Sequence, residues 1–185
     1  METLDAIKKR ASLKSRLSSR EVEPEKINTI LEAARLAPSA RNMQPWRFIV
    51  LKDKAIIDKA VKAAFGQGNA PMGQAPVIII ACADPDDDVI RDGKEYYLHD
   101  VACAMQNLVL AATDLGLATH MAAGIDEAEL KKVLGIPEKV RFVLATPVAY
   151  PSEGSYDEAS RERLGERTRK EMKEITFLNG WGQPF

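Results

Sequence analysis

The stretch from Ala37 to Phe48 has the residue types of a loop that lies flat against a planar ligand. Proline, small and polar residues follow one another between a predicted helix and a predicted strand. Core packing explains Trp46, but an apolar core gains nothing from the small and polar residues before it. Binding sites use backbone groups and short polar side chains to orient a ligand. The candidate contacts in this loop are Pro38, Ser39, Ala40 and Asn42.

A second pattern, Arg10-Ala-Ser-Leu-Lys14, spaces two cations and a hydroxyl two residues apart. If this segment is extended, Arg10, Ser12 and Lys14 point to the same side of the chain. Charged N–H donors and a hydroxyl on one side can hold a phosphate. Taken alone, the pattern is more typical of a solvated helix face, because further basic residues surround it.

Three further segments carry weaker signals. The glycine-rich stretch 63–73 permits close approach of the backbone to a ligand. It lacks the Lys-Ser/Thr pair of a Walker loop, which excludes a nucleoside-triphosphate loop. The stretch 121–126 is typical of a small-residue turn from a strand to a helix. Arg161 and Arg163 would face the same way only in an extended chain, and the mixed charges around them are typical of a solvated helix.

Taken in order, these five segments resemble the nitroreductase family of FMN-dependent oxidoreductases, over nearly the whole chain. The resemblance implies that Arg10 and Ser12 bind the FMN phosphate. It places Lys14 near the ribityl chain and the pyrimidine edge of the ring, where a cation stabilises negative charge. It also implies that the loop 38–42 touches a flavin held mainly by the partner subunit. The chain has Ala11 where the family often has a second basic residue.

The same resemblance gives roles to the other three segments. Gln67 is the first choice, and Asn69 the second, for a hydrogen bond to the edge of the flavin ring. The backbone at Ala123 and Gly124 would lie at the ring nitrogen that accepts hydride. A basic pair after the last core strand would close on the phosphate. The residues that match this pair are Arg161 and Arg163.

Composition limits the class of protein. The chain has 185 residues, of which 45% are hydrophobic and 29% charged, which predicts a soluble globular protein. A net charge of −1 gives no field that favours nucleic acid or a membrane surface. The charged start has no apolar signal core, so export is not expected. Cys82 and Cys103 have the apolar neighbours of reduced core thiols, which favours a cytoplasmic location.

Helices and short strands must position these residues. The 3.6-residue period predicts helices over 24–34, 54–64, about 94–115 and 127–134. Pro24 and Asp53 suit the starts of the first two. Asp126 and Glu129 predict a capping box before the last, which ends at Gly135. Apolar runs predict strands over 48–51, 77–83, 119–123 and 142–149.

The predicted fold is a single α+β domain over 1–185, with a C-terminal arm from about residue 165. Its three α/β/α layers hold a mixed, mostly antiparallel sheet flanked by helices. Pro147 places the last strand at an edge or a bulge. The long helix from Val101 to Leu115 is apolar nearly all round. We expect this helix to form the core of a homodimer with FMN at the subunit interface.

The resemblance implies transfer of hydride from NADH or NADPH to FMN, then of electrons to an acceptor such as a nitroaromatic or a quinone. Ping-pong kinetics are expected. The alternatives are a flavin-binding or redox-sensing protein without turnover, a specialised relative that reduces enones, dehalogenates or consumes flavin, and a structural dimer. No protein acid, nucleophile or metal ligand stands out, and His99 and His120 are interpreted as structural.

Overall fold

The computed structural model describes residues 1–154 and 167–185. The chain divides into two compact units, Met1–Ser155 and Tyr156–Phe185. All but two of the predicted site residues lie in the first unit. The exceptions are Arg161 and Arg163, which lie outside the described residues.

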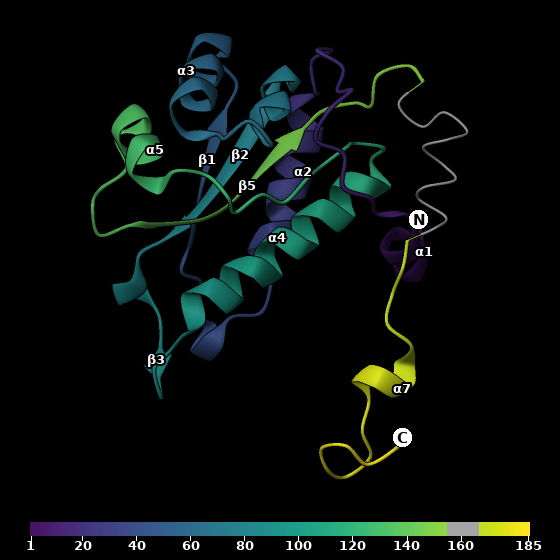
Figure 1. Ribbon diagram of the computed structural model, residues 1–185. Helices are drawn as coiled ribbons and strands as arrows, with labels where there is room; N and C mark the ends of the chain where they lie inside the picture. The colour runs from purple at the N-terminus through teal and green to yellow at the C-terminus, as the bar shows by residue number, and fades with distance from the viewer. Residues whose placement is uncertain (155–166) are drawn as a thin grey trace. The chain divides into compact units, whose positions relative to one another are not determined.

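A three-stranded antiparallel sheet forms the middle of the first unit (Figure 1). Its strands are β1 (Trp46–Leu51), β2 (Val77–Ala83) and β5 (Arg141–Val148), in the order β1-β2-β5. Every residue of β2 is buried. The continuous apolar run that predicted this strand reflects its central place, because both of its faces are covered by helices.

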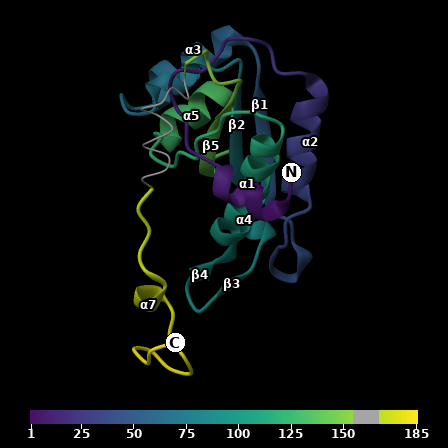
Figure 2. The ribbon, with the colours of Figure 1, turned by 90° about the vertical axis from the view of Figure 1, so that its right-hand side faces the viewer.

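Helices cover both faces of the sheet (Figures 1 and 2). On one face α2 (Pro24–Arg35) and α4 (Tyr96–Asp114) pack against Ile79 and Ala81. On the other, α3 (Lys54–Ala64) and α5 (Glu127–Leu134) pack against Ile78 and Ile80. Alternate residues of a strand point to opposite faces, so one strand supplies both clusters. This arrangement confirms the predicted α+β fold with three layers.

The helix ends follow the predicted caps in most details. Pro24 is the first residue of α2, and the carboxylate of Asp53 accepts two N–H groups of α3. Gly135, with φ of 67°, ends α5 in the left-handed conformation that suits glycine. The capping box before α5 is half wrong. Asp126 accepts the N–H of Glu129 at 3.0 Å, but the Glu129 carboxylate pairs with Lys132 at 2.6 Å.

The 3.6-residue period places Ile56 on the apolar face of the helix predicted over 54–64, and this placement is wrong. Ile56 lies on the second predicted helix, yet its side chain is 44% exposed, whereas the buried residues of α3 are Ile57, Ala60 and Ala64. Position 56 follows the N-cap by three residues. The helix turns this position out of the 100° stripe that faces the sheet.

The segment 119–123, predicted as a weak strand, forms isolated bridges. Ala118 pairs with Ala149 and Ala122 with Ala145, both antiparallel to β5. Pro147 lies between these bridges and has no N–H to donate, so the ladder is interrupted there. A parallel bridge from Ser12 to Thr119 completes the mixed pairing that the sequence predicted.

Shorter elements connect this framework. They are α1 (Thr3–Lys9), η1 (Ala40–Asn42), η2 (Ala70–Gln74), η3 (Pro85–Asp87) and a hairpin of β3 (Ile90–Arg91) with β4 (Lys94–Glu95). In the second unit, α7 (Met172–Ile175) precedes a turn closed by a Phe177–Pro184 bridge. Within the described residues, every helix is too short or too polar to cross a bilayer.

Candidate functional site

The segment that carries Arg10, Ser12 and Lys14 is extended. Ser12 pairs with Thr119, and the N–H of Leu13 donates to the carbonyl of Thr119 at 2.8 Å. Leu13 packs inward, while Ser12 and Lys14 are exposed. The Nη1 of Arg10 donates to Ser12 Oγ at 3.4 Å. The extended reading of this pattern is therefore confirmed, and the solvated-helix reading is wrong.

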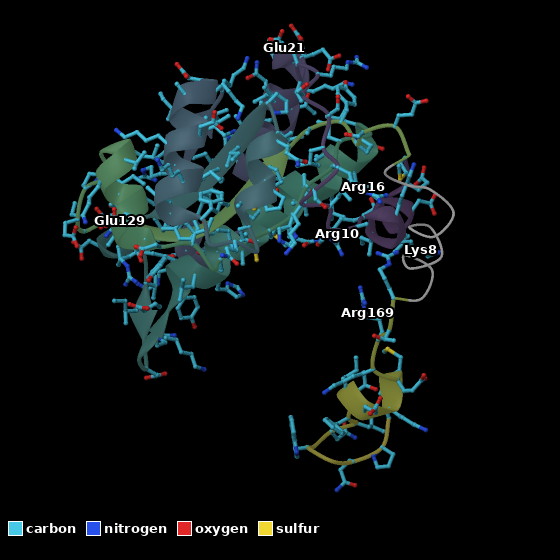
Figure 3. All side chains as sticks on the ribbon, turned by 45° about the horizontal axis from the view of Figure 1, so that its top comes forward. Lys8, Arg10, Arg16, Glu21, Glu129 and Arg169 are labelled. Atoms are coloured by element: carbon cyan, nitrogen blue, oxygen red, sulfur yellow. The ribbon has the colours of Figure 1, made fainter. Side chains whose placement is uncertain are left out.

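Basic side chains gather around this segment. Figure 3 shows Lys8, Arg10 and Arg16 on one side of the first unit, at α1 and the chain that follows it. Glu129, on α5, lies on the opposite side of the unit in the same view. A group of cations around an exposed hydroxyl is a favourable place for an anion such as a phosphate.

The turn at Ala123 and Gly124 is linked to the loop after α3. The Nδ2 of Asn69 donates to the carbonyl of Gly124 at 2.9 Å, and the N–H of Ile125 donates to the carbonyl of Ala123 at 2.8 Å. Among the described residues, no backbone hydrogen bond uses the N–H of Ala123 or of Gly124. Both residues are exposed. The two carbonyls of the turn are thus used in hydrogen bonds within the described residues, whereas its two N–H groups are not.

His120 lies between the cationic segment and this turn. Its backbone N–H donates to Thr146 Oγ1 at 3.0 Å, because Pro147 interrupts the ladder. Its Nδ1 is buried and has no partner among the described residues. Burial lowers the pKa of His120, and the positive charge of Lys14 lowers it further. The imidazole is therefore neutral at pH 7, and Lys14 supplies the positive charge here.

Backbone strain gathers in the loop 38–44. Arg41, Asn42 and Gln44 have positive φ values of 48°, 59° and 52°. Each such non-glycine residue costs on the order of 1–3 kcal/mol, and strain of this kind concentrates at ligand sites. Local hydrogen bonds offset part of the cost. The N–H of Gln44 donates to Ser39 Oγ at 3.0 Å, and that of Asn42 to the Ser39 carbonyl at 3.1 Å.

A buried carboxylate ties this loop to α4. Asp100 is 1% exposed, and its Oδ2 accepts the N–H of Ala40 at 2.6 Å. Its Oδ1 lies 3.0 Å from Nδ1 of His99. Asp100 is not among the predicted site residues. The sequence does contain a signal for Asp100, because the helical period places its carboxylate on the same buried face of α4 as Ala104 and Leu108.

The loop 38–44 and the segment 10–14 lie at opposite ends of α4 (Figure 1). Ala40 bonds to Asp100 near the start of α4, whereas the N-terminal amine of Met1 pairs with Asp114 in its last turn at 2.8 Å. Ser12 pairs with Thr119, just beyond that end. At roughly 1.5 Å per residue, Asp100 and Asp114 are about 20 Å apart. A group held by the segment 10–14 is therefore remote from the loop of the same chain.

The remaining predicted residues lie near the Gly124 turn. Gln67 is exposed in the loop after α3, two residues before Asn69. A cavity of about 510 Å³ lies elsewhere, between α2 and β1, and none of the predicted site residues lines it.

Comparisons with known proteins agree on one family. A model of the nitroreductase family matches residues 7–150. A protein of Archaeoglobus fulgidus, described as a candidate NADH dehydrogenase/NAD(P)H nitroreductase, is 35% identical over 141 residues. This alignment covers 74% of this chain and 78% of that protein. An iodotyrosine deiodinase of Haliscomenobacter hydrossis is 30% identical over 168 residues, covering 75% of this chain and 74% of that protein.

Solved structures show the same fold. A nitroreductase family protein from Clostridium novyi NT superposes with a TM-score of 0.77 and 31% identity, covering 100% of this chain and 97% of that chain. One from Clostridium difficile 630 gives a TM-score of 0.81 and 28% identity, covering 97% and 99%. The family match spans most of the chain, including the first four predicted site segments. The chain therefore belongs to the nitroreductase family.

Proposed function

We propose that this chain is a cytoplasmic oxidoreductase that works as a homodimer with FMN at the subunit interface. It passes hydride from NADH or NADPH to FMN and then electrons to a small acceptor such as a nitroaromatic or a quinone. Donor and acceptor occupy the same place in turn, so the kinetics are ping-pong. When bound, FMN supplies the hydride-accepting ring that the reaction needs.

The observation that carries this proposal is the pairing of Ser12 with Thr119. This bridge sets the cationic segment beside the extended segment that leads from Thr119 into the turn at Ala123 and Gly124. The guanidinium, ammonium and hydroxyl donors of the segment 10–14 then lie near one end of the segment 119–124. The backbone N–H donors of the turn lie at its other end. These donor types fit an anionic phosphate and a flavin ring edge respectively.

Each of these residues has a defined task in the proposed site. Arg10 and Ser12 bind the phosphate, and Lys14 stabilises negative charge as the ring is reduced. Asn69 binds the Gly124 carbonyl and so anchors the turn, whose Ala123 and Gly124 N–H groups we assign to the ring edge. Gln67, which is exposed, is the direct contact to the ring edge.

The homodimer is supported by the position of two predicted site segments at opposite ends of α4. The loop 38–42 lies about 20 Å along the helix from the segment 10–14, at roughly 1.5 Å rise per residue. A loop that contacts flavin from this distance is best supplied by a second copy of the chain. Arg161 and Arg163, outside the described residues, are proposed as further phosphate contacts.

Exposed apolar side chains at both ends of α4 also support a second copy. Leu98 on α4 is 46% exposed, and Ala102 and Gln106 leave the same side of the helix uncovered. Further large apolar residues are exposed on α1 and in or beside the loop. They are Leu4, Ile7, Leu36 and Met43. Burial of such surface stabilises a dimer by roughly 25 cal/mol per Å² of apolar area.

The second unit is proposed to be an arm that packs on the partner subunit. Trp181 is 92% exposed and Phe185 86% exposed. Trp181 contacts Phe177, with the ring centroids 4.9 Å apart. Aromatic residues of this size are costly to leave in water, and a partner surface would cover them.

A second candidate reaction is reductive dehalogenation. It is favoured by the 30% identity to the iodotyrosine deiodinase, over three quarters of this chain. A short connection between β2 and α4 is compatible with either reaction, because it consists of η3 and the two-residue strands β3 and β4. Release of iodide from an iodinated phenol, measured beside nitroaromatic reduction, separates the two activities.

The experiment that tests the proposed function is the visible spectrum of the purified protein without oxygen. NADPH and then NADH are added, followed by a quinone or a nitroaromatic. We expect flavin bands that bleach with a nicotinamide and recover with the acceptor. Flavin bands that respond to neither nicotinamide would favour a flavin-binding protein, and absence of flavin binding would contradict the proposal.

A further inference from the structure

The loop 38–44 holds a conformation that its own residues do not favour. Six described non-glycine residues have positive φ, and three of them lie in this loop. Arg41 and Gln44 lack the side-chain chemistry that makes the left-handed region accessible to Asn and Asp. A loop of this kind keeps one shape only when surrounding structure holds it there.

Most of the hydrogen bonds that hold the loop are local. The N–H of Gln44 donates to Ser39, the Nε2 of Gln44 donates to the Asn42 carbonyl at 3.2 Å, and Arg47 donates to the Gln44 carbonyl at 3.3 Å. Among the described residues, the bond from Ala40 to Asp100 is the one that joins the loop to a distant part of the chain. Its partners are 60 positions apart.

The Asp100 carboxylate is itself held in place. It is buried on α4, the longest helix among the described residues, and His99 Nδ1 lies 3.0 Å from its second oxygen. Asp88 lies against it, with a buried Oδ2 that has no donor among the described residues. Burial raises the pKa of Asp88, and the charge of Asp100 adds to the rise.

We propose that Asp100 is a positioning residue for the flavin site, because its buried carboxylate fixes the strained loop 38–44 at the end of α4. The inference rests on the proposed function, in which this loop contacts the flavin of the partner subunit. Asp100 touches neither flavin nor substrate. It acts through the N–H of Ala40, and it sets the place at which Ser39, Ala40 and Asn42 meet the ring.

The variants Asp100→Ala and Asp100→Asn separate positioning from general stability. Alanine removes the acceptor of the Ala40 N–H, whereas asparagine keeps an acceptor oxygen of the same length without the charge. Asp114→Ala is the matched control, since it makes the same chemical change in the last turn of the same helix. Asp114 is exposed and pairs with the N-terminal amine.

The first measurement is hydrogen exchange of the full chain, without added FMN, followed in peptides that cover 37–48. In Asp100→Ala we expect exchange there to rise at least about tenfold, because a charge-assisted hydrogen bond is lost. Asp100→Asn should retain most of the protection, and Asp114→Ala should match the wild-type protein. Unchanged exchange in 37–48, or an equal rise throughout the chain, would overturn the proposal.

The second measurement is the Kd for FMN, together with kcat and KM for the acceptor. We expect Asp100→Ala to weaken FMN binding by about tenfold and Asp100→Asn by less than about threefold. Equal Kd and KM values in wild type and Asp100→Ala would overturn the positioning role. If the wild-type chain bound no FMN, the proposed function would fail, while the exchange experiment would still decide whether Asp100 fixes the loop.

Discussion

Asn69 donates its side-chain N–H to the carbonyl of Gly124 at 2.9 Å, across 55 positions of sequence. The bond joins the loop after α3 to the turn before α5. A neighbouring bond, from the N–H of Asp126 to the carbonyl of Ala64 at 2.9 Å, runs between the same two parts. Gln67 stands on the same loop but is exposed. We therefore propose different tasks for the two amides, which substitution can separate.

Replacing Asn69 with Ala should destabilise the protein without FMN by about 1 kcal/mol, the net value of one hydrogen bond. For a chain of this length, that lowers Tm by roughly 2–4 °C. Replacing Gln67 with Ala should leave that Tm unchanged and weaken FMN binding. Thermal unfolding with and without FMN measures both effects. Equal behaviour of the two variants would show that the amides share one role.

Replacing Arg10 with Ala should raise the Kd for FMN by one to two powers of ten, because a charge-assisted contact contributes roughly 1.5–3 kcal/mol. Lys9→Ala is the control, since it removes a neighbouring exposed cation of α1. Titration of the flavin-free protein with FMN gives both constants. Arg163→Ala extends the test to the segment outside the described residues. Wild-type affinity in both arginine variants would contradict the phosphate assignment.

Most of the scaffold can be predicted from local pattern. Periodicity and caps depend on residues a few positions apart, which is why β2 and the bounds of α4 agree with their predicted ranges. Contacts between distant parts of the chain produce no comparable pattern among neighbouring residues of the sequence. The bond of Asp100 to Ala40 and that of Asn69 to Gly124 join residues 60 and 55 positions apart. Their side chains alone do not indicate these partners.

The failed capping box has partly the same physical origin. Glu129 was expected to close a capping box with Asp126, but a nearby Lys132 offers it a charged partner. The N–H of Asp126 is then satisfied by Ala64, a residue of another helix. A competing ion pair within α5 and a contact with α3 thus replaced the predicted half of the capping box. The positive φ values of the loop 38–44 are likewise imposed by its surroundings rather than by glycine at those positions.

Replacing Tyr150 with Phe should make the free energy of unfolding depend less on pH in the acidic range. The Tyr150 hydroxyl donates to Glu23 at 2.6 Å and is the main reason that the pKa of Glu23 falls to about 2. A lowered folded-state pKa stabilises the protein above the unfolded value of 4.5, and this contribution is lost as pH falls toward 2. Phenylalanine keeps the aromatic ring, whose centroid lies 4.2 Å from the Cζ of Arg20.

The measurement for Tyr150→Phe is urea unfolding between pH 7 and pH 2, compared with the wild-type protein. The variant should be less stable above about pH 5, and the difference should shrink as the pH falls below the unfolded-state pKa of a Glu. Thr113→Ser is a control, because it keeps a hydroxyl bond within α4 and touches no carboxylate. A difference that stays constant across this range would show that Tyr150 stabilises the fold independently of the Glu23 charge.

Ala102→Arg should separate the proposed homodimer and release FMN together with it. Ala102 is exposed on the uncovered side of α4, where a guanidinium would be buried without a partner in a helix-to-helix interface. Ala128→Arg is the matched control, because Ala128 is an exposed alanine of α5. Sedimentation velocity gives the mass, and the visible spectrum gives the bound flavin. We expect a monomer without flavin for Ala102→Arg and a flavin-loaded dimer for Ala128→Arg. A flavin-loaded monomer would mean that one chain completes the site, so the loop 38–42 would have no contact with a partner's flavin.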